Sequence, residues 1–243
     1  MIKHIKLKAI TLSTISVFMF TSCSDDFTEV EPKGSVSYEN FCNTEDDAKL
    51  AVNSLYNEMK ASEMFSRGFF WYINASDDMI TGRIKADADN IKNFVCTGDE
   101  GYTKYMYEAA FKVIRRANDI LKNVPEMNID ENLKNRMLGE AYFMRGFHYF
   151  WLAHTYGDDG QNGGIPIVTV DNMEAPAGSY ERPSSVEENY EKIVQDLNAA
   201  AELLPLFTEM SGADYGRAHK DAAYAYIAKT YLYCAQYDSS KYA

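Results

Sequence analysis

The chain has 243 residues, and its 24 basic and 36 acidic side chains give a formal net charge of −12 at pH 7. This balance argues against proteins that bind nucleic acid or anionic membrane surfaces, because both kinds of partner need positive charge facing phosphate. The length is enough for one substantial hydrophobic core.

The first residues have the form of an export signal. Lysines precede an apolar run over residues 9–20, which is too short to cross the ~30 Å of hydrocarbon in a bilayer. The Thr-Ser-Cys sequence at 21–23 resembles the lipobox of bacterial lipoproteins, although Phe20 stands where leucine is usual. We therefore predict a signal peptide over residues 1–22 and a mature chain that begins at a lipidated Cys23. The alternative is an ordinary secreted protein.

Residues 23–43 are polar and are expected to form a lipidated tether. Asp25 and Asp26 directly follow the start of this segment and resemble the acidic export signal of surface lipoproteins in Gram-negative glycan degraders. The alternative is that they simply open a solvated linker. On the first interpretation the lipoprotein would face the cell exterior.

The remaining cysteines are Cys42, Cys96 and Cys234. They are widely spaced and form no CxxC or Cys/His cluster, so the sequence predicts no zinc site. Cys234 lies in an apolar helical pattern and is expected to pack in the core. Cys42 and Cys96 could form a disulfide, and their spacing leaves that question open.

Apolar residues recur at helical spacing along most of the chain. Thr44, followed by acidic residues, is a typical helix start. Pro125 and Pro205 are stop signals, and Gly157 is a C-cap signal. We predict helices over residues 44–59, 65–74, 102–124, 130–156, 184–204 and 219–236.

Two segments between these helices have no clear period. Residues 76–100 are rich in Asp, Gly and Asn and predict a long surface loop. Loops longer than about 12–15 residues are uncommon in compact domains and are usually functional or mobile. Residues 157–183 predict an irregular connection that carries a Gly-Ile-Pro sequence.

The helices are expected to pair as hairpins in the style of tetratricopeptide repeats, which makes the fold class all-α with long irregular loops. The second half of the 130–156 helix is apolar nearly all round, so it should be buried on most sides. Trp71 and Trp151 lie inside apolar helical runs and are assigned to the core. Arg145, among aromatic residues, is interpreted as part of a structural ion pair or carbonyl clamp.

Three stretches together resemble the SusD/RagB family of outer-membrane nutrient-binding lipoproteins. They are EAYFMRGFHYF at 140–150, with the Tyr-Gly and Gly-Ile-Pro that follow it; RPSS at 182–185, with the Asp-Leu and Leu-Leu-Pro that follow it; and GRAHK at 216–220. Family members are usually about twice as long, so the resemblance implies that residues 44–243 form the N-terminal helical-repeat domain, truncated at its C-terminal end. The implied fold is the SusD-like α/α superhelix.

The resemblance also implies where a ligand binds. In this family the site is a shallow aromatic arc on the loops, where sugar rings stack on aromatic faces and hydroxyls meet polar side chains. The candidates are the aromatic and polar residues of the 76–105 region, namely Arg83, Asn90, Asn93, Phe94, Tyr102 and Tyr105. The alternative for each of them is that it anchors its own loop.

Catalytic chemistry is not predicted. Asp77 and Asp78 are adjacent acids at a helix end, an arrangement that is usually solvated, whereas glycosidases need two carboxylates ~5–10 Å apart. His148 and His154 are six positions apart and do not share a helical face as metal ligands would. The sequence has no GxSxG, HExxH or phosphate-binding glycine loop. We expect no catalytic residues, no metal and no cofactor.

The resemblance therefore implies a non-enzymatic, lipid-anchored protein of the cell outer membrane that binds an oligosaccharide or polysaccharide. In the family the partner is a SusC-like TonB-dependent transporter, to which the ligand is delivered. Peptide ligands also occur in the family. The alternative is a helical-repeat adaptor that binds peptides or envelope proteins on a concave face.

Overall fold

Helices make up the regular structure of the part of the chain that the computed structural model describes. This part comprises residues 44–60, 64–66, 68, 70–78, 82, 86–158, 163–237 and 240. The α-helices are α2 Glu45–Met59, α3 Phe70–Asn74, α4 Ala86–Lys92, α5 Gly101–Asn123, α6 Glu131–Tyr156, α7 Val186–Leu203 and α8 Lys220–Cys234. No strand occurs among these residues, where an isolated bridge pairs Asp158 with Gly163. The predicted all-α class is confirmed.

Several predictions fall on residues outside this part. The predicted signal peptide, the tether with Cys23, and Cys42 all lie outside the described residues. Within the described part, no helix is both long enough and apolar enough to span a bilayer.

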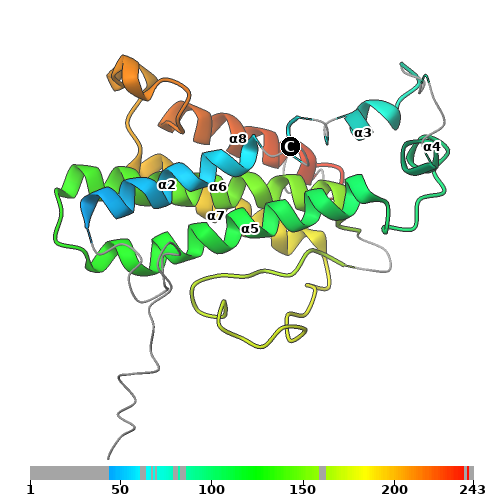
Figure 1. Cartoon of the computed structure of the whole chain (residues 1–243), viewed down its shortest axis with the longest axis horizontal. Helices are drawn as coiled ribbons and strands as arrows, with labels where there is room; N and C mark the ends of the chain where they lie inside the picture. The colour runs from blue at the N-terminus through cyan, green and yellow to red at the C-terminus, as the bar shows by residue number, and fades with distance from the viewer. Residues whose placement is uncertain are drawn as a thin grey trace, which may run out of the picture. The chain divides into compact units, whose positions relative to one another are not determined.

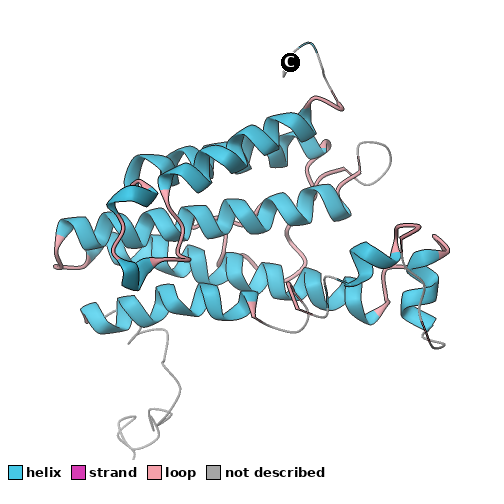
Figure 2. Ribbon diagram, turned by 90° about the horizontal axis from the view of Figure 1, so that it is seen from above, coloured by secondary structure: helices cyan, strands magenta, loops and turns pink. Residues whose placement is uncertain are grey.

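The long helices lie side by side with α6 in the centre (Figures 1 and 2). Helix α6 packs against α5, α7 and α2, and α8 packs mainly against α7. Helix α5 passes through the short 3-10 turn Val124–Glu126 before α6 begins, so consecutive helices form hairpins, as the tetratricopeptide-like pattern predicted.

Helix α6 is the core of this arrangement. Its second half buries Tyr149, Phe150 and Leu152 completely, together with most of the residues around them. A helix that is apolar on every side can be stable only where other elements cover all of its faces. The central position of α6 therefore follows directly from its composition.

Local signals in the sequence determine where the helices begin and end. Thr44 and Asp47 form a reciprocal capping box at the start of α2, and Ser185 caps α7 by accepting a hydrogen bond from the Glu187 amide. Gly157 ends α6 with a φ of −78°, so the backbone at this position does not adopt the left-handed conformation that commonly requires a glycine at a helix end. A Cβ at this position would lie 2.4 Å from the Ala153 carbonyl oxygen, and glycine is needed for close approach.

The region between α2 and α5 differs from the prediction. The helix expected over 65–74 is only Phe70–Asn74 among the described residues. The loop expected over 76–100 contains α4, Ala86–Lys92. The sequence of this short helix, ADADNIK, has one large apolar residue, Ile91, so it has no apolar period that a sequence pattern could reveal.

The aromatic assignments are partly confirmed. Trp151 packs edge-on against Phe65, Tyr72 and Phe147, but it remains half-buried. The side chain of Trp71 lies outside the described residues. Cys234 is buried as predicted, and Cys96 is an exposed thiol, so neither forms a disulfide with another described cysteine.

A buried histidine makes the stability of this core depend on pH. His148 is fully buried, its Nδ1 lies 2.7 Å from the Met144 carbonyl oxygen, and burial lowers its pKa to about 4. The unfolded chain binds this proton near pH 6.5, so folding loses stability as the pH falls from 6.5 towards 4. We expect His148 to account for a loss of about 2 kcal/mol between pH 7 and pH 5.

Urea unfolding at several pH values, followed by circular dichroism, measures this effect. The His148→Gln variant should show a shallower dependence of unfolding free energy on pH over the same window, whatever its absolute stability. An unchanged slope in the variant would contradict the assignment.

Candidate functional site

The structure describes most of the predicted site residues. They lie in and after α4 and in the first two turns of α5, and they are Asn90, Asn93, Phe94, Tyr102 and Tyr105. Arg83 lies outside the described residues. Phe94 is 79% exposed and Tyr105 is 51% exposed, whereas Tyr102 is half-buried.

We use the name loop surface for the exposed residues of this region, defined as Asn93, Phe94, Tyr105 and, in addition to the predicted residues, Val95. Asn93 and Val95 are exposed as well. Large apolar side chains that stay this open to water mark interaction sites more often than packing sites. The alternative that each aromatic merely anchors its own loop does not fit Phe94, because its ring is almost fully in solvent.

The backbone holds Phe94 in an unusual conformation. Its φ is +56°, in the left-handed region that side chains other than glycine rarely adopt. The Phe94 amide donates to the Ile91 carbonyl and the Val95 amide to the Asn90 carbonyl, which together form a Schellman cap on α4. Phenylalanine at a position that favours glycine costs about 1–2 kcal/mol. Strain kept at an exposed ring is typical of functional sites.

Glu100 fixes the loop that carries these residues. Its carboxylate accepts hydrogen bonds from the amides of Thr97 at 3.0 Å and Gly98 at 2.9 Å, and from the side chain of Asn90 at 3.3 Å. The amide of Thr97, followed by the other donors, lowers the pKa of Glu100 below its usual range. Asn90 therefore supports the loop through its side chain, as the alternative interpretation of a loop-anchoring residue predicted.

Sequence reasoning missed Glu100. An acid directly before a helix usually caps that helix through its side chain, but this carboxylate turns back and binds the preceding loop. The available signal was the Thr-Gly pair just before it, because a tight turn leaves amides that need an acceptor.

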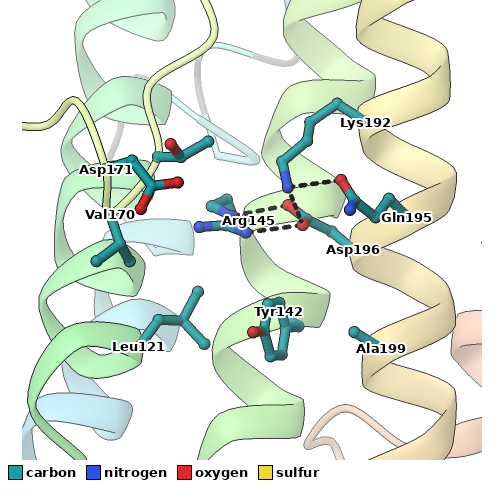
Figure 3. Close-up of a pocket in the computed structure, with 10 residues that line it drawn as sticks. Leu121, Tyr142, Arg145, Val170, Asp171, Lys192, Gln195, Asp196 and Ala199 are labelled. Carbon is teal, nitrogen blue, oxygen red and sulfur yellow. Dashed lines mark hydrogen bonds and ion pairs between the residues drawn. The ribbon is translucent and has the colours of Figure 1, made fainter.

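A second feature is a cavity of about 600 Å³, which we call the central cavity (Figure 3). It lies between α5, α6, α7 and the segment 169–171. Its lining is mainly polar and charged, and includes Tyr142, Arg145, Asp171, Lys192, Gln195 and Asp196.

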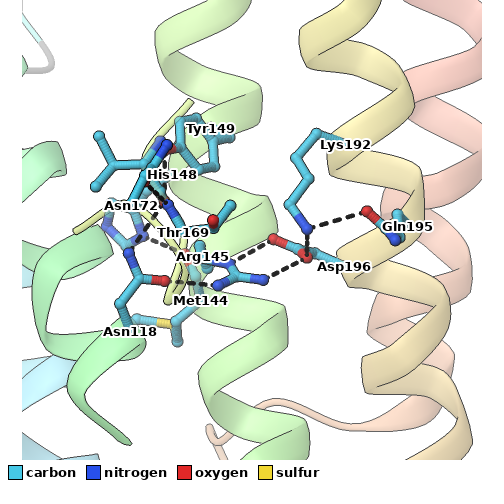
Figure 4. Close-up of polar contacts among 11 residues, drawn as sticks. Asn118, Met144, Arg145, His148, Tyr149, Thr169, Asn172, Lys192, Gln195 and Asp196 are labelled. Carbon is cyan, nitrogen blue, oxygen red and sulfur yellow. Dashed lines mark hydrogen bonds and ion pairs between the residues drawn. The ribbon is translucent and has the colours of Figure 1, made fainter. Parts of the chain in front are cut away.

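A buried ion pair forms part of its lining (Figure 4). The Arg145 guanidinium donates to both oxygens of Asp196 at 2.7 Å and to the Asn118 side chain at 2.6 Å. Lys192 lies 2.9 Å from the same carboxylate. Burial lowers the pKa of Arg145, but the hydrogen bonds and charge of Asp196 outweigh this, so its pKa is raised and it stays charged. The predicted structural role of Arg145 is confirmed.

The acids and histidines that the sequence offered for catalysis or metal binding are exposed or bonded to the backbone. Asp77 and Asp78 are both exposed. His148 and His154 each bond a backbone carbonyl one turn earlier on α6. In the part of the chain that the structure describes, no group of His, Cys, Asp and Glu side chains is placed to hold a metal ion.

The family model described as "Starch-binding associating with outer membrane" matches residues 26–232, most of the chain. The chain belongs to the SusD-like family. The family's description associates its members with starch binding and the outer membrane.

Individual relatives agree with this assignment. SusD-like protein P2 of Formosa agariphila is 30% identical over 230 residues, which cover 90% of this chain and 42% of that protein. A SusD-like protein of Bacteroides ovatus is 25% identical and is matched over 93% of this chain and 39% of its own length. The chain thus spans less than half of the length of these curated relatives.

Solved structures show the same fold. The crystal structure of a SusD-like protein from Bacteroides fragilis superposes with a TM-score of 0.66 at 26% identity, covering 82% of this chain and 37% of that one. A laminarin-binding SusD-like protein superposes with a TM-score of 0.67 at 24% identity, covering 79% of this chain and 41% of that one.

Proposed function

We propose that this SusD-like protein binds glycans without catalysing their cleavage, and that the loop surface is part of its binding site. The observation that carries the proposal is Phe94, a strained and 79% exposed aromatic ring on a loop that Glu100 holds in place. A flat exposed ring offers a stacking face to the C–H side of a sugar, and the neighbouring Asn93 offers hydrogen bonds to hydroxyls.

We further propose that the protein is anchored in the outer membrane through a lipid on Cys23, faces the exterior, and delivers its ligand to a SusC-like TonB-dependent transporter. The export signal with its cysteine and the outer-membrane description of the family support this proposal. Residues 44–243 would then be the N-terminal helical-repeat domain of such a protein, which fits the share of the relatives that the chain matches.

One observation favours a role in binding proteins as the second candidate function. Helix α8 exposes Tyr224, Tyr231 and Leu232 at 55%, 41% and 72%, at spacings that place them along one side of the helix. An exposed apolar face on a helix of a repeat stack is suited to pack against a further helix. An adaptor that binds envelope proteins would use this face.

Affinity electrophoresis tests glycan binding. The chain without residues 1–23 would be run through gels that contain starch, laminarin or other polysaccharides. Retardation by one of them supports the proposal and names its ligand class. A folded helical protein that no polysaccharide retards would favour the adaptor.

Removing the exposed ring should weaken glycan binding. We expect Phe94→Ala to lower the affinity for the retarding polysaccharide by about tenfold, because a shallow site depends on few contacts. The measurement is the dissociation constant from the same gels.

Phe94→Gly provides the matched control. It also removes the ring but relieves the left-handed strain, so it should bind as weakly as Phe94→Ala while raising the unfolding free energy by about 1 kcal/mol. Leu50→Ala, which truncates an exposed side chain on α2, should leave binding unchanged. Full affinity in both Phe94 variants would remove the loop surface from the proposed site.

A further inference from the structure

We propose that the central cavity is a second saccharide-binding site, which takes a neutral sugar residue and is separate from the loop surface. Four parts of the chain build it. Leu121 comes from α5, Tyr142 from α6, Gln195 from α7, and Asp171 from the irregular connection. Its volume of about 600 Å³ lies within the range of ~300–1,000 Å³ that small-molecule sites occupy.

The charges around the cavity balance each other. Arg145 and Lys192 both contact Asp196, which leaves one positive charge in excess. Asp171 supplies the compensating negative charge from the opposite side of the guanidinium (Figure 3). An anion or a cation would therefore gain little net electrostatic attraction here, and the lining has no net charge that would favour a charged ligand over a neutral one.

The lining keeps hydrogen-bonding capacity for a ligand. Among the described residues, no hydrogen bond joins another side chain or backbone group to the Tyr142 hydroxyl, the Asp171 carboxylate or the Gln195 amide nitrogen. Together they offer donors and acceptors on several sides of one space. Vicinal hydroxyls, each of which can donate and accept, match such a mixed set better than a ligand with acceptors alone.

The wall that carries Asp171 is held in place before any ligand arrives. The Tyr149 hydroxyl exchanges hydrogen bonds with the amide and carbonyl of Val168, at 2.7 and 3.1 Å. Asn118 donates to the same carbonyl at 3.0 Å. The Thr169 amide then donates to Asn172 at 2.8 Å, which closes the turn around Asp171. A fixed wall reduces the entropy that binding must overcome.

The opposite wall is equally fixed. Asp196 is 1% exposed and Arg145 is 3% exposed. Their two parallel hydrogen bonds hold both side chains in one position in the lining of the cavity. Lys192 is held by this carboxylate and by the Gln195 side-chain oxygen at 3.0 Å. The Gln195 amide nitrogen is thereby turned to a defined position.

Amide chemical-shift mapping of the isotope-labelled chain tests the inference. The probes are maltohexaose and laminarihexaose, each titrated to about 10 mM, because single sugar subsites bind weakly. We expect saturable shifts at the backbone amides of Val170 and Asp171 and at the side-chain amide of Gln195 for at least one probe.

The variants that test the cavity replace exposed side chains, so they should fold normally. Asp171→Ala combined with Gln195→Ala should weaken the cavity response by at least about tenfold. The matched control combines Glu181→Ala and Asn198→Ala, which remove exposed side chains from the same connection and the same helix outside the cavity. This control should respond as the parent does.

The outcomes separate this inference from the proposed function. Shifts confined to residues 93–105 would overturn the cavity site and leave the loop surface standing. Shifts confined to the cavity would support the cavity site and would remove the loop surface from the proposed function. Cavity shifts that survive the Asp171→Ala and Gln195→Ala pair, or no cavity shift with either probe, would also overturn the inference.

Discussion

Asp196→Asn should destabilise the fold by about 3–5 kcal/mol, because it breaks a buried ion pair. Asp196 is 1% exposed, and it forms ion pairs with Arg145 on α6 and with Lys192 on its own helix. The amide would leave a buried guanidinium without its counter-charge between α6 and α7. Urea unfolding followed by far-UV circular dichroism measures the loss.

Two further variants make that prediction specific. Asp171→Asn changes an exposed acid that lines the same cavity, and it should alter stability by less than about 0.5 kcal/mol. Arg145→Met combined with Asp196→Leu removes both charges of the fully buried pair. It should recover a large part of the loss, because the guanidinium is removed together with its counter-charge and Lys192 keeps the Gln195 oxygen as a partner. If Asp196→Asn alone had the small effect of a surface substitution, the ion pair would not be a structural requirement.

Glu140→Gln should cost about 2–4 kcal/mol, because Glu140 joins separate parts of the fold. Its carboxylate is 1% exposed and accepts from the Tyr56 hydroxyl at 2.6 Å, from Arg136 at 3.2 Å and from Arg217 at 3.1 Å. Burial, followed by the charge of Glu140, raises the pKa of Tyr56 above its usual range. The neutral amide would remove the carboxylate that pairs with Arg217, whereas Arg136 would keep its ion pair with Asp214.

The loss of stability should appear first in α2 and α8, which Glu140 on α6 connects through Tyr56 and Arg217. Hydrogen exchange of the amides in α2 and α8 should speed up in Glu140→Gln more than exchange in α7, because Arg217 lies just before α8 and also bonds Asn53 on α2 at 2.9 Å. Glu131→Gln, on the first exposed turn of the same helix, is the matched control and should change stability by less than about 0.5 kcal/mol. Equal effects of the two substitutions would contradict the joining role.

The features that could be predicted from the sequence are those that depend on residues close together in the chain. The capping box at Thr44 and the buried course of α6 follow from local patterns, and the structure has both. The structural role of Arg145 could be expected from its aromatic surroundings. Its partner Asp196 could not, because nothing in the sequence indicates that residues 51 positions apart meet across two helices.

The features that were missed depend on distant residues or on very short segments. Helix α4 has 7 residues with one large apolar side chain, Ile91, which is too little to form a pattern. Glu100 departs from the usual behaviour of an acid before a helix, since it binds the preceding loop. The central cavity combines α5, α6, α7 and an irregular connection, and its existence depends on how the last of these lies against the helices.

The way Phe94 is held bears on how the ligand range of such a protein could change through evolution. Its position comes from two backbone hydrogen bonds, and its ring stays in solvent. Tyrosine or tryptophan would meet the same left-handed strain and the same open space. One substitution would therefore present a broader or more polar stacking face while the loop kept its shape. Under the function proposed above, new glycan preferences would arise there without repacking the fold.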